Sequence, residues 1–518
     1  MNIGLFGHFV MNGLSLLASL FVVAVGVFAL VVVVLFIADV SQTKDAVRRN
    51  YPVIGRFRYL FTRLGEFFRQ YFFALDREEL PFNRAERDWV YRSAAGADNT
   101  IAFGSTRNLS VPGTPIFVNC AFPTLDEDAM ETSQVTVGPF TANPYRFSSL
   151  INISAMSYGA LSAPAVRALS KGARMAGCWL NTGEGGLAPA HLEGGCAIVF
   201  QIGTAKYGVR NPEGRLDEGR LREIAAIPQV KMIELKLSQG AKPGKGGILP
   251  AVKVTPEIAA IRGIPVHTDS ISPNRHPEIE NVSDLIDYIE RLRLISGKPV
   301  GFKSVIGAYG WLEAMCEEIR KRGLESAPDF ITVDSGDGGT GAAPMALMDN
   351  VGLSVRESLP LVVDILSRHG LRERVKVFAS GKLITPAEVA WALCAGADSV
   401  NSARGFMFAL GCIQSLKCNK NTCPTGITTH DRRLQRGLNP DDKAVRIANF
   451  VTKMEKEVGI IAHSCGVRDP RRLRRYHCRI VQSDGRSIPM TELYPDRPGE
   501  GVILPRAARV HSDADKLL

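Results

Sequence analysis

From Ile151 onward, short apolar runs alternate with glycine-rich loops and with longer stretches of helical spacing. The runs are rich in β-branched and aromatic residues, as buried strands are. Strands that alternate in this way with helices indicate a parallel α/β fold. The eight runs lie at residues 151–156, 178–183, 196–203, 232–238, 299–305, 329–335, 375–381 and 399–405.

Eight strands within about 280 residues predict a (β/α)8 TIM barrel. A further apolar run at 264–270 is interpreted as an excursion outside the barrel. The predicted domains are a short non-cytoplasmic N-terminus (1–13), a transmembrane helix (14–38), a juxtamembrane helical and N-terminal extension (39–150), the barrel with a cysteine cluster (151–435) and a C-terminal helical extension and tail (436–518).

The N-terminal region contains an uncharged apolar run from Leu14 to Ala38. Its length matches the roughly 20 residues that span a bilayer as a helix. A cleaved signal peptide is the alternative, although residues 1–13 lack the Lys or Arg of a basic n-region. Positive residues stay on the cytoplasmic side, so we expect a single-pass membrane protein with a cytoplasmic catalytic domain. The basic residues after the run are Lys44, Arg48, Arg49, Arg56, Arg58 and Arg63.

Composition is that of a globular protein, with 45% hydrophobic and 22% charged residues and a net charge of +10. The excess positive charge falls in two places. The juxtamembrane segment predicts contact with anionic lipid, and its aromatic helices at 51–96 would lie near the membrane or pack on the main domain. Residues 467–479, "VRDPRRLRRYHCR", predict a solvated face or a docking surface for an acidic partner. No nucleic-acid motif accompanies them, so we expect no nucleic-acid partner.

Glycine-rich loops follow the second, fourth and sixth strands: "NTGEGG", "SQGAKPGKGG" and "DSGDGGTGAAP". Such loops let the backbone approach a flat or phosphorylated ligand. The loops after the last two strands occupy the usual phosphate position of such barrels. There Lys382 and Arg404 add charge beside the amides of Gly381 and Gly405, unless these glycines are simply turns.

Charged residues inside or beside the apolar strands are the candidate site. Lys303 within a strand implies either an anionic ligand, such as a reduced flavin, or a protein carboxylate as partner. A second basic set could hold a small dicarboxylate, with Glu184 as an acid/base or amine-orienting group. Taken singly, each member could instead be a surface charge. The set is Lys236, Gln239, Lys242 and Arg262.

Three cysteines, Cys412, Cys418 and Cys423, follow the last strand at spacing C-x5-C-x4-C. Reduced thiols of a cytoplasmic protein are available for metal binding. With His430 as a fourth ligand they could hold zinc, or they could be inert thiols. An iron–sulfur cluster that lacks one corner iron would need only three cysteines.

Four motifs occur in this order: "NTGEGG", "IELKLSQGAKPGKGG", "GDGGTGAAP" and "LGCIQSLKCNKNTCPTG". Together they resemble the FMN-binding synthase domain of glutamate synthase, from roughly Ile151 to His430. With a membrane span at its start and no amidotransferase domain, the chain is similar to the stand-alone, membrane-anchored members of that family. The resemblance implies FMN and a 3Fe-4S cluster as cofactors, with Cys412, Cys418 and Cys423 as cluster ligands.

The resemblance also implies a role for each matching residue. Glu184, Gln239, Lys242 and Arg262 would meet 2-oxoglutarate or its imine, with Lys236 beside them and with Glu184 and Lys242 as catalytic groups. The residues around FMN would be Ser157, Gln201, Lys303, Gly338, Gly339, Gly381, Lys382, Ala403 and Arg404.

The expected reaction is the reduction of 2-iminoglutarate, from 2-oxoglutarate and ammonia or an amino donor, to glutamate. No dinucleotide-binding G-x-G-x-x-G follows a strand, so we expect an electron-donor protein, either a ferredoxin or an NADPH-oxidising subunit. Two alternatives remain at this stage. One is an FMN oxidoreductase for another 2-oxo or 2-hydroxy acid, and the other is a membrane-tethered electron-transfer module.

Overall fold

The computed structural model describes residues 3–42, 45–68, 71–72 and 75–495 of the chain. It consists of two compact units, Met1–Ala85 and Glu86–Leu518, which are described separately. Lys44 of the predicted basic flank, and the tail from residue 496, lie outside the described residues.

The N-terminal unit is built on the apolar helix α1 (Ile3–Ser41), whose part from Met11 to Ser41 contains an 18-residue window with a mean hydropathy of 3.4. α1 is therefore long and apolar enough to cross a membrane. It begins at Ile3, so the helix includes residues 3–13, which precede the predicted span. The short α2 (Ala46–Asn50) and the amphipathic α3 (Gly55–Phe68) follow.

Asp39, near the end of α1, is fully buried and ties these helices together. It accepts hydrogen bonds from the guanidinium groups of Arg48, at 2.6 and 2.9 Å, and of Arg56, at 2.7 and 2.8 Å. Its second oxygen also accepts from the amide of Val53 at 3.1 Å. Large apolar side chains of α3, among them Phe57 and Phe61, remain exposed.

The second unit contains the predicted barrel. Eight parallel strands close in the order β10-β11-β12-β13-β4-β5-β6-β7. The strands are β4 (Ile151–Ile153), β5 (Trp179–Asn181), β6 (Ala197–Ile202), β7 (Val230–Lys236), β10 (Val300–Val305), β11 (Phe330–Asp334), β12 (Lys376–Ser380) and β13 (Ser399–Ser402). Each falls on one of the eight predicted runs, which confirms the barrel. From the ninth run only Ser270 is in a strand, in the pair β8 (Ile248–Leu249) and β9 (Ser270–Ile271) outside the barrel.

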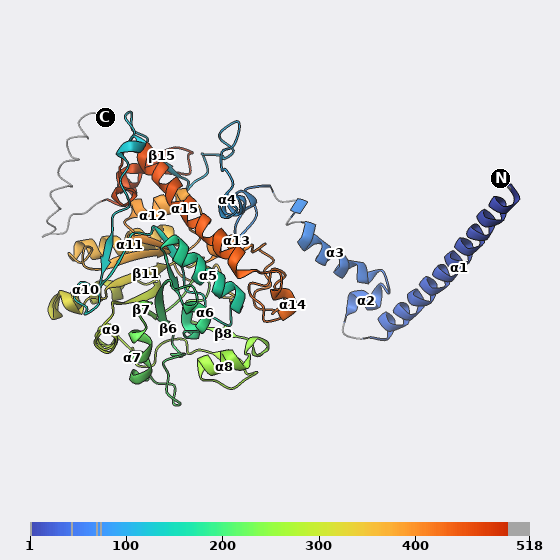
Figure 1. Ribbon diagram of the computed structural model, residues 1–518, viewed down its shortest axis with the longest axis horizontal. Coiled ribbons are helices and arrows are strands. Elements are labelled where there is room, and N and C mark those ends of the chain that lie inside the picture. Colours follow the sequence, from blue (N-terminus) through green and yellow to red (C-terminus); the bar gives the residue numbers. More distant parts are fainter. Residues whose placement is uncertain (1–2, 43–44, 69–70, 73–74, 496–518) are drawn as a thin grey trace. The chain divides into compact units, whose positions relative to one another are not determined.

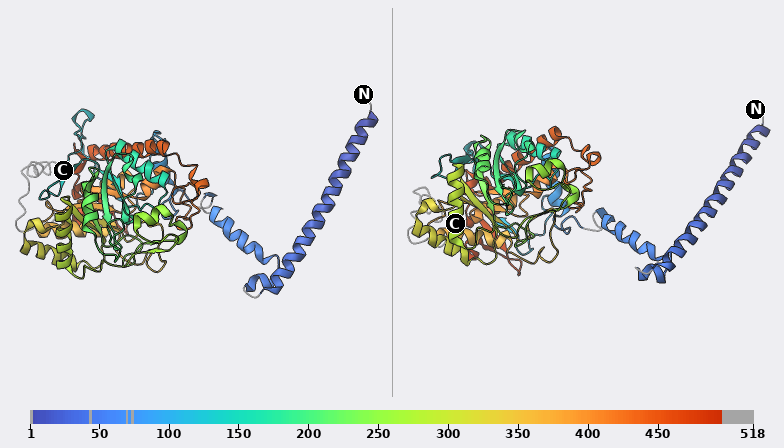
Figure 2. Two further views of the ribbon diagram at one scale, coloured as in Figure 1. Left: turned by 60° about the horizontal axis from the view of Figure 1, so that its bottom comes forward. Right: turned by 90° about the horizontal axis from the view of Figure 1, so that it is seen from below.

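Helices surround the strands, as Figures 1 and 2 show. Those that follow barrel strands are α5 (Ala163–Ala176), α6 (Pro189–Leu192), α7 (Glu218–Ala226), α8 (Pro256–Arg262), α9 (Val282–Ser296), α10 (Gly310–Arg322), α11 (Val355–Arg368), α12 (Pro386–Ala395) and α13 (Arg404–Leu410). The long α15 (Pro440–Ser464) runs along α5. The remaining elements are α4 (Arg84–Ala94), α14 (Arg432–Gln435), α16 (Met490–Leu493), β1 (Pro115–Phe117), β2 (Val135–Val137), β3 (Tyr145–Phe147), β14 (Cys478–Val481) and β15 (Ser487–Pro489).

Helix α4 and the β2–β3 hairpin, which precede the barrel in the sequence, pack against this unit. The indole of Trp89 on α4 lies edge-on to Phe450 of α15, at 5.9 Å between ring centres. This part of the predicted juxtamembrane segment therefore packs on the main domain. The β2–β3 hairpin contributes Val137 and Phe147 to the core at one end of the barrel.

The barrel interior is arranged in tiers because alternate residues of a strand point to the same side. The lowest tier is apolar and consists of Trp179, Val199, Met232, Phe330 and Phe378, together with the two hairpin residues.

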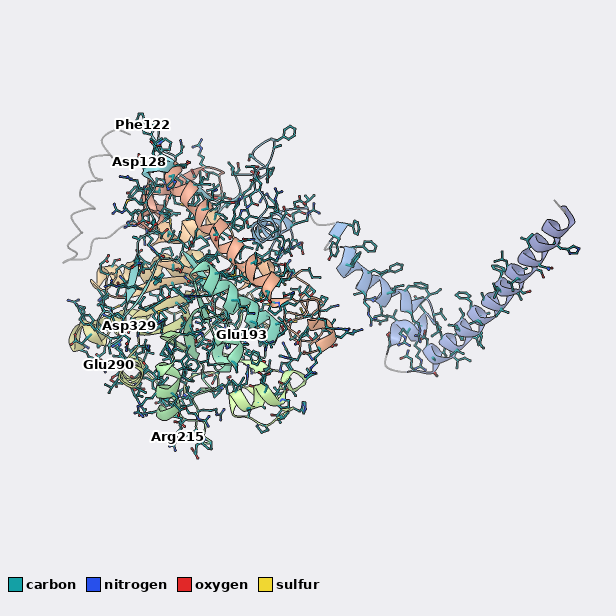
Figure 3. The ribbon with its side chains drawn as sticks, viewed as in Figure 1. Phe122, Asp128, Glu193, Arg215, Glu290 and Asp329 are labelled. Atoms are coloured by element: carbon teal, nitrogen blue, oxygen red, sulfur yellow. The ribbon has the colours of Figure 1, made fainter. Side chains whose placement is uncertain are left out.

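Asp329, labelled in Figure 3, lies one residue before β11 and is fully buried. It accepts hydrogen bonds from Arg293 at 3.0 Å and from Arg374 at 2.9 Å.

The basic segment 467–479 is partly structural, because two of its arginines bind other parts of the domain. Arg471 donates to the carbonyls of Ser133, Ser148 and Ser149, and its guanidinium lies 5.2 Å from the centre of the Phe147 ring. Arg475 is buried and pairs with Asp364 at 2.5 Å. These two arginines stabilise loops by satisfying carbonyl groups and are structural, whereas Arg468, Arg472 and Arg474 of the same segment are exposed, as a solvated face or a docking surface requires.

Candidate active site

The carboxyl ends of β5 and β7 bring Glu184 and Lys236 together. Glu184 lies in the short turn after β5, and its Oε1 is 2.9 Å from the Nζ of Lys236. Lys236 also donates to the Oε1 of Gln239, whose amide nitrogen donates to Thr340 Oγ1 at 2.9 Å. Three of the predicted substrate-site residues therefore form one connected chain of contacts.

Two more of the predicted cations lie beside this chain. Lys242 and Arg262 are each 4% exposed, and both hold the pKa of Glu184 down together with Lys236. Arg262, in the last turn of α8, donates to Ser270 Oγ at 2.9 Å and to the carbonyl of Tyr158 at 3.2 Å. Its buried Nε has no hydrogen-bond partner among the described residues.

Ionisation in this cluster follows from burial and neighbouring charge. Burial would raise the pKa of Glu184, but Lys236, Lys242 and Arg262 outweigh it, so its pKa is lower than usual. Burial, together with the charge of Lys236, lowers the pKa of Lys242 to about 8, although Glu184 offsets part of the shift. Glu184 is thus held as a carboxylate, and Lys242 changes charge at mildly alkaline pH.

Close backbone contacts fix the position of Glu184. A Cβ on Gly247 would lie 2.1 Å from Glu184 Oε1, and a Cβ on Gly203 would lie 2.6 Å from Glu184 Cβ. Any side chain at either position would collide with the carboxylate or its stem. The glycines of the loops after β6 and β7 are therefore needed for close packing around Glu184.

Lys303 on β10 lies near a protein carboxylate, which is the alternative partner considered above. Its Nζ is 3.6 Å from Asp334 Oδ2, an ion-pair distance that is too long for a hydrogen bond. The same Oδ2 accepts from the amide of Gly240 at 3.1 Å, and Oδ1 accepts from the amide of Ser335 at 3.0 Å. Asp334 therefore joins the glycine-rich loops after β7 and β11.

The loops after β11, β12 and β13 meet around Asp337. Its Oδ2 is 3.1 Å from the Nζ of Lys382, and its carbonyl accepts from Arg404 at 3.2 Å. A Cβ on Gly339 would lie 2.9 Å from Arg404 Nε, and a Cβ on Gly338 would lie 3.2 Å from Asp334 Oδ1. The structure thus brings the predicted phosphate-loop residues together beside two aspartates.

The remaining predicted cofactor residues lie in three places. Ser157 packs against the Glu184 turn, since a Cβ on Gly185 would lie 2.9 Å from Ser157 Cβ. Ala403 immediately precedes α13. Gln201 lies inside the barrel, 1% exposed, and donates to Glu234 at 2.6 Å.

The three cysteines lie in the loop between α13 and α14. Burial raises the pKa of Cys412 to about 12, and the neighbouring Cys418 and Cys423 raise it as well. The described part of the chain contains no three His, Cys, Asp or Glu side chains that already converge on a metal position. The ring of His430 bonds through Nε2 to the carbonyl of Gly159 at 2.8 Å, so that nitrogen is not directed to a zinc site with the thiols.

The chemistry around the thiols nevertheless suits an anionic cluster. The ammonium of Lys253, 2% exposed, donates to the carbonyls of Ala160 at 2.8 Å and Cys418 at 3.2 Å. Thr425 Oγ1 is 3.3 Å from Cys423 Sγ. The buried hydroxyl of Thr428 lies beside Cys418 and Cys423, and its interaction with each thiol favours the thiolate form.

Sequence reasoning missed several residues that the fold brings to this site. Asp334 and Asp337 belong to the quoted "DSGDGG" motif, where two acids among glycines were the available signal. Glu234, the acid inside the apolar run "MIELKLS", was likewise visible as a charge in a buried strand. Lys253 carries no local signal, because its partners come from loops more than ninety residues away in the sequence.

Comparison with known proteins gives one family. Residues 123–468 match the model of the conserved region in glutamate synthase. The glutamate synthase large subunit-like protein YerD of Bacillus subtilis (strain 168) is 37% identical over 92% of this chain and 98% of its own length. The archaeal glutamate synthase (NADPH) of Methanocaldococcus jannaschii is 35% identical over 64% of this chain, which spans 61% of that protein.

Solved structures with a similar arrangement include a mandelate oxidase variant and a flavocytochrome b2 variant. The oxidase is 17% identical, with a TM-score of 0.39 over 77% of this chain and 98% of the other. The flavocytochrome is 16% identical, with a TM-score of 0.42 over 82% of this chain and 87% of the other.

Proposed function

This chain belongs to the glutamate synthase family and is an oxidoreductase of that family, and we propose that it reduces 2-iminoglutarate, formed from 2-oxoglutarate and ammonia, to L-glutamate. The relatives' names support the reaction class. The choice of substrate rests on the charge of the site.

The observation that carries this choice is an imbalance of buried charge. Lys236, Lys242 and Arg262 are buried around a single carboxylate, Glu184. Three cations and one anion leave these four side chains with two excess positive charges. Buried charge is costly unless it is paired, so the site favours a ligand with two negative charges. 2-Oxoglutarate has two carboxylates and meets this requirement.

The protein residues would divide the work as follows. Arg262 and Lys242 would bind the two carboxylates through charge-assisted hydrogen bonds. Glu184, kept ionised by its neighbours, would accept a hydrogen bond from the incoming ammonia or from the iminium N–H and so orient the C=N bond. Lys236, whose Nζ lies 2.9 Å from Glu184, would donate a proton to the substrate.

FMN would lie against the loops after β10 to β13. Lys303 and Gln201 would face its ring, while Lys382, Arg404 and the adjoining glycine amides would hold its phosphate. Two observations support FMN binding here. Lys303 is buried, and a Cβ on Gly339 would crowd Arg404, so the backbone and this arginine lie close together. When bound, FMN supplies the hydride that reduces the 2-imino carbon.

Cys412, Cys418 and Cys423 would hold a 3Fe-4S cluster, supported by the ammonium of Lys253 and by the Thr428 hydroxyl, which favours the thiolate form of Cys418 and Cys423. Electrons would come from a separate donor protein. Exposed cations surround this loop, and none of them forms an ion pair with another described residue, which favours an acidic donor such as a ferredoxin. They are Lys417, Lys420, Arg432, Arg433 and Arg436.

The protein would be anchored in a membrane by α1, with the barrel on the cytoplasmic side. The apolar length of α1 supports the span, and the arginines that follow it support the orientation. The exposed aromatic face of α3, with its arginines, would contact the headgroup region of an anionic membrane.

An anaerobic half-reaction tests the proposal. The full chain is purified in detergent, its FMN, iron and sulfide are measured, and the flavin is photoreduced. Addition of 2-oxoglutarate with ammonium is expected to reoxidise the flavin and yield one glutamate per flavin. A loaded flavin that is not reoxidised would refute glutamate synthesis, and a panel of other 2-oxo acids would then identify the substrate. Zinc in place of iron would refute the cluster.

A pair of arginine variants makes the test specific to the charge argument. Arg262→Gln should weaken 2-oxoglutarate binding by about 100-fold, because a charge-assisted hydrogen bond contributes roughly 1.5–3 kcal/mol. Arg215, an exposed arginine labelled in Figure 3, is the control, and Arg215→Gln should leave 2-oxoglutarate binding unchanged. Equal behaviour of the two variants would contradict the assignment of the dicarboxylate site.

A further inference from the structure

A buried carboxylate in the middle of the barrel has no role in the function described so far. Glu234 on β7 is 1% exposed and lies one tier below Lys236, two residues earlier on the same face of the strand. No Lys, Arg or His of the described chain forms an ion pair with it. An acid of this kind is costly unless hydrogen bonds satisfy it.

Three neutral side chains from three other strands supply these bonds. Asn181 Nδ2 on β5 donates to Glu234 Oε2 at 2.8 Å, and Gln201 Nε2 on β6 donates to the same oxygen at 2.6 Å. Thr332 Oγ1 on β11 donates to Oε1 at 2.7 Å. All three are at most 2% exposed. Glu234 is therefore the centre of a buried polar tier between the apolar core below and the reactive tier above.

The carboxylate fixes which way each amide faces. A carboxylate only accepts hydrogen bonds, so both amides must present their NH2 groups to it. The oxygen of Asn181 then accepts the amide N–H of Gly183 at 3.0 Å, in the turn that carries Glu184. Because the NH2 group of Gln201 faces Glu234, its amide oxygen remains available to accept a hydrogen bond from another group. The position of the Glu184 turn and the orientation of the Gln201 amide thus both depend on Glu234.

We infer that Glu234 is the positioning residue of this active site: it fixes the turn of Glu184 through Asn181, and it orients Gln201 so that its amide oxygen is presented to the N–H edge of the bound flavin ring. The flavin half of this inference rests on the proposed function. The Asn181–Gly183 half does not.

Glu234→Gln tests the inference because it keeps the shape and removes an oxygen acceptor. The new NH2 group cannot accept from Thr332, Gln201 or Asn181, so at least one of these bonds is lost. FMN titrated into the flavin-free full chain should bind about tenfold more weakly, as expected when the hydrogen bond between the ring and the neutral Gln201 amide is lost. Amide hydrogen exchange of peptides that contain Gly183 should become faster, and this readout requires no cofactor.

Glu455→Gln is the matched control. Glu455 is a half-buried carboxylate of this unit, and it accepts from the amide of Leu150 at 2.9 Å, one residue before β4. Its variant should leave the FMN affinity and the Gly183 exchange unchanged. If Glu234→Gln changes neither readout, or if Glu455→Gln changes both equally, the inference is overturned. Faster exchange at Gly183 in a protein that binds no FMN would uphold the positioning role and refute the proposed cofactor instead.

Discussion

Gly381→Ala gives the sharpest test of how the barrel loops are packed. Gly381 directly follows β12, with φ at +131°, and its Cβ would lie 2.2 Å from Ser335 Cβ. Ser335 is fully buried and cannot move aside freely. Its hydroxyl donates to Asp337 and accepts from the amide of Val355 at 2.8 Å.

The cost has two parts. Two carbon atoms prefer a separation of about 3.5 Å or more, so the loops must part by roughly 1.3 Å. Overpacking of this kind costs about 1–3 kcal/mol, and a backbone conformation that only glycine adopts readily costs about 1–3 kcal/mol more. The expected loss is therefore about 4 kcal/mol, a large share of a typical unfolding free energy of about 5–15 kcal/mol.

Gly370→Ala separates the two parts. Gly370, after α11, also has a positive φ, +69°, but nothing lies within 4 Å of its Cβ position. Its variant should lose only about 1 kcal/mol, the conformational cost alone. With a urea slope of about 3 kcal/mol/M, the unfolding midpoint should fall by about 1.3 M for Gly381→Ala and by about 0.3 M for Gly370→Ala.

The assay is urea unfolding of the flavin-free full chain in detergent, followed by fluorescence of the buried Trp179 and Trp391. Removing FMN matters because a ligand of the native state would add its own stabilisation. Equal midpoints for the two variants would refute the steric reasoning. A fall for Gly381→Ala combined with unchanged FMN affinity would refute the assignment of this loop to the cofactor.

Four further predictions concern separate parts of the protein. Because burial lowers the pKa of Lys242 to about 8, kcat/KM for 2-oxoglutarate should fall as pH rises through 8, while Lys242→Arg should keep its value to higher pH. Cys423→Ala should reduce the iron content to background, with FMN content retained, in a colorimetric assay against the wild type. Lys253→Met removes the donor to two carbonyl groups, so hydrogen exchange in the cysteine loop should become faster. Val25→Arg places a charge in the apolar span at a cost of about 3 kcal/mol, and should shift the protein from the carbonate-resistant membrane fraction to the supernatant.

The barrel could be predicted because its signals are local. Each strand is an apolar run that ends in a polar or glycine-rich loop, and eight such runs in sequence leave few architectures. The residues at the strand ends were predicted for the same reason. Lys236 ends a buried strand and Glu184 and Gln239 follow buried strands, and parallel strands bring their carboxyl ends to one side of the barrel.

The partners of these residues could not be predicted in the same way. Lys303 meets Asp334 only because β10 and β11 are neighbours in the closed barrel. Arg471 was expected at a surface, but the free carbonyls of loops more than seventy residues away bind it. A sequence records that a side chain is charged, whereas the partner that neutralises it depends on which distant segments the fold brings together.

The β2–β3 hairpin has a practical consequence for producing this enzyme domain. Its Phe147 ring lies edge-on to Trp179, at 4.8 Å between ring centres, and closes the base of the barrel with Val137. A truncated protein that starts at Ile151, where the barrel strands begin, would leave Trp179, Phe330 and Phe378 open to water and prone to aggregation. A fragment expected to fold and remain soluble must therefore include the hairpin and start upstream of Val135.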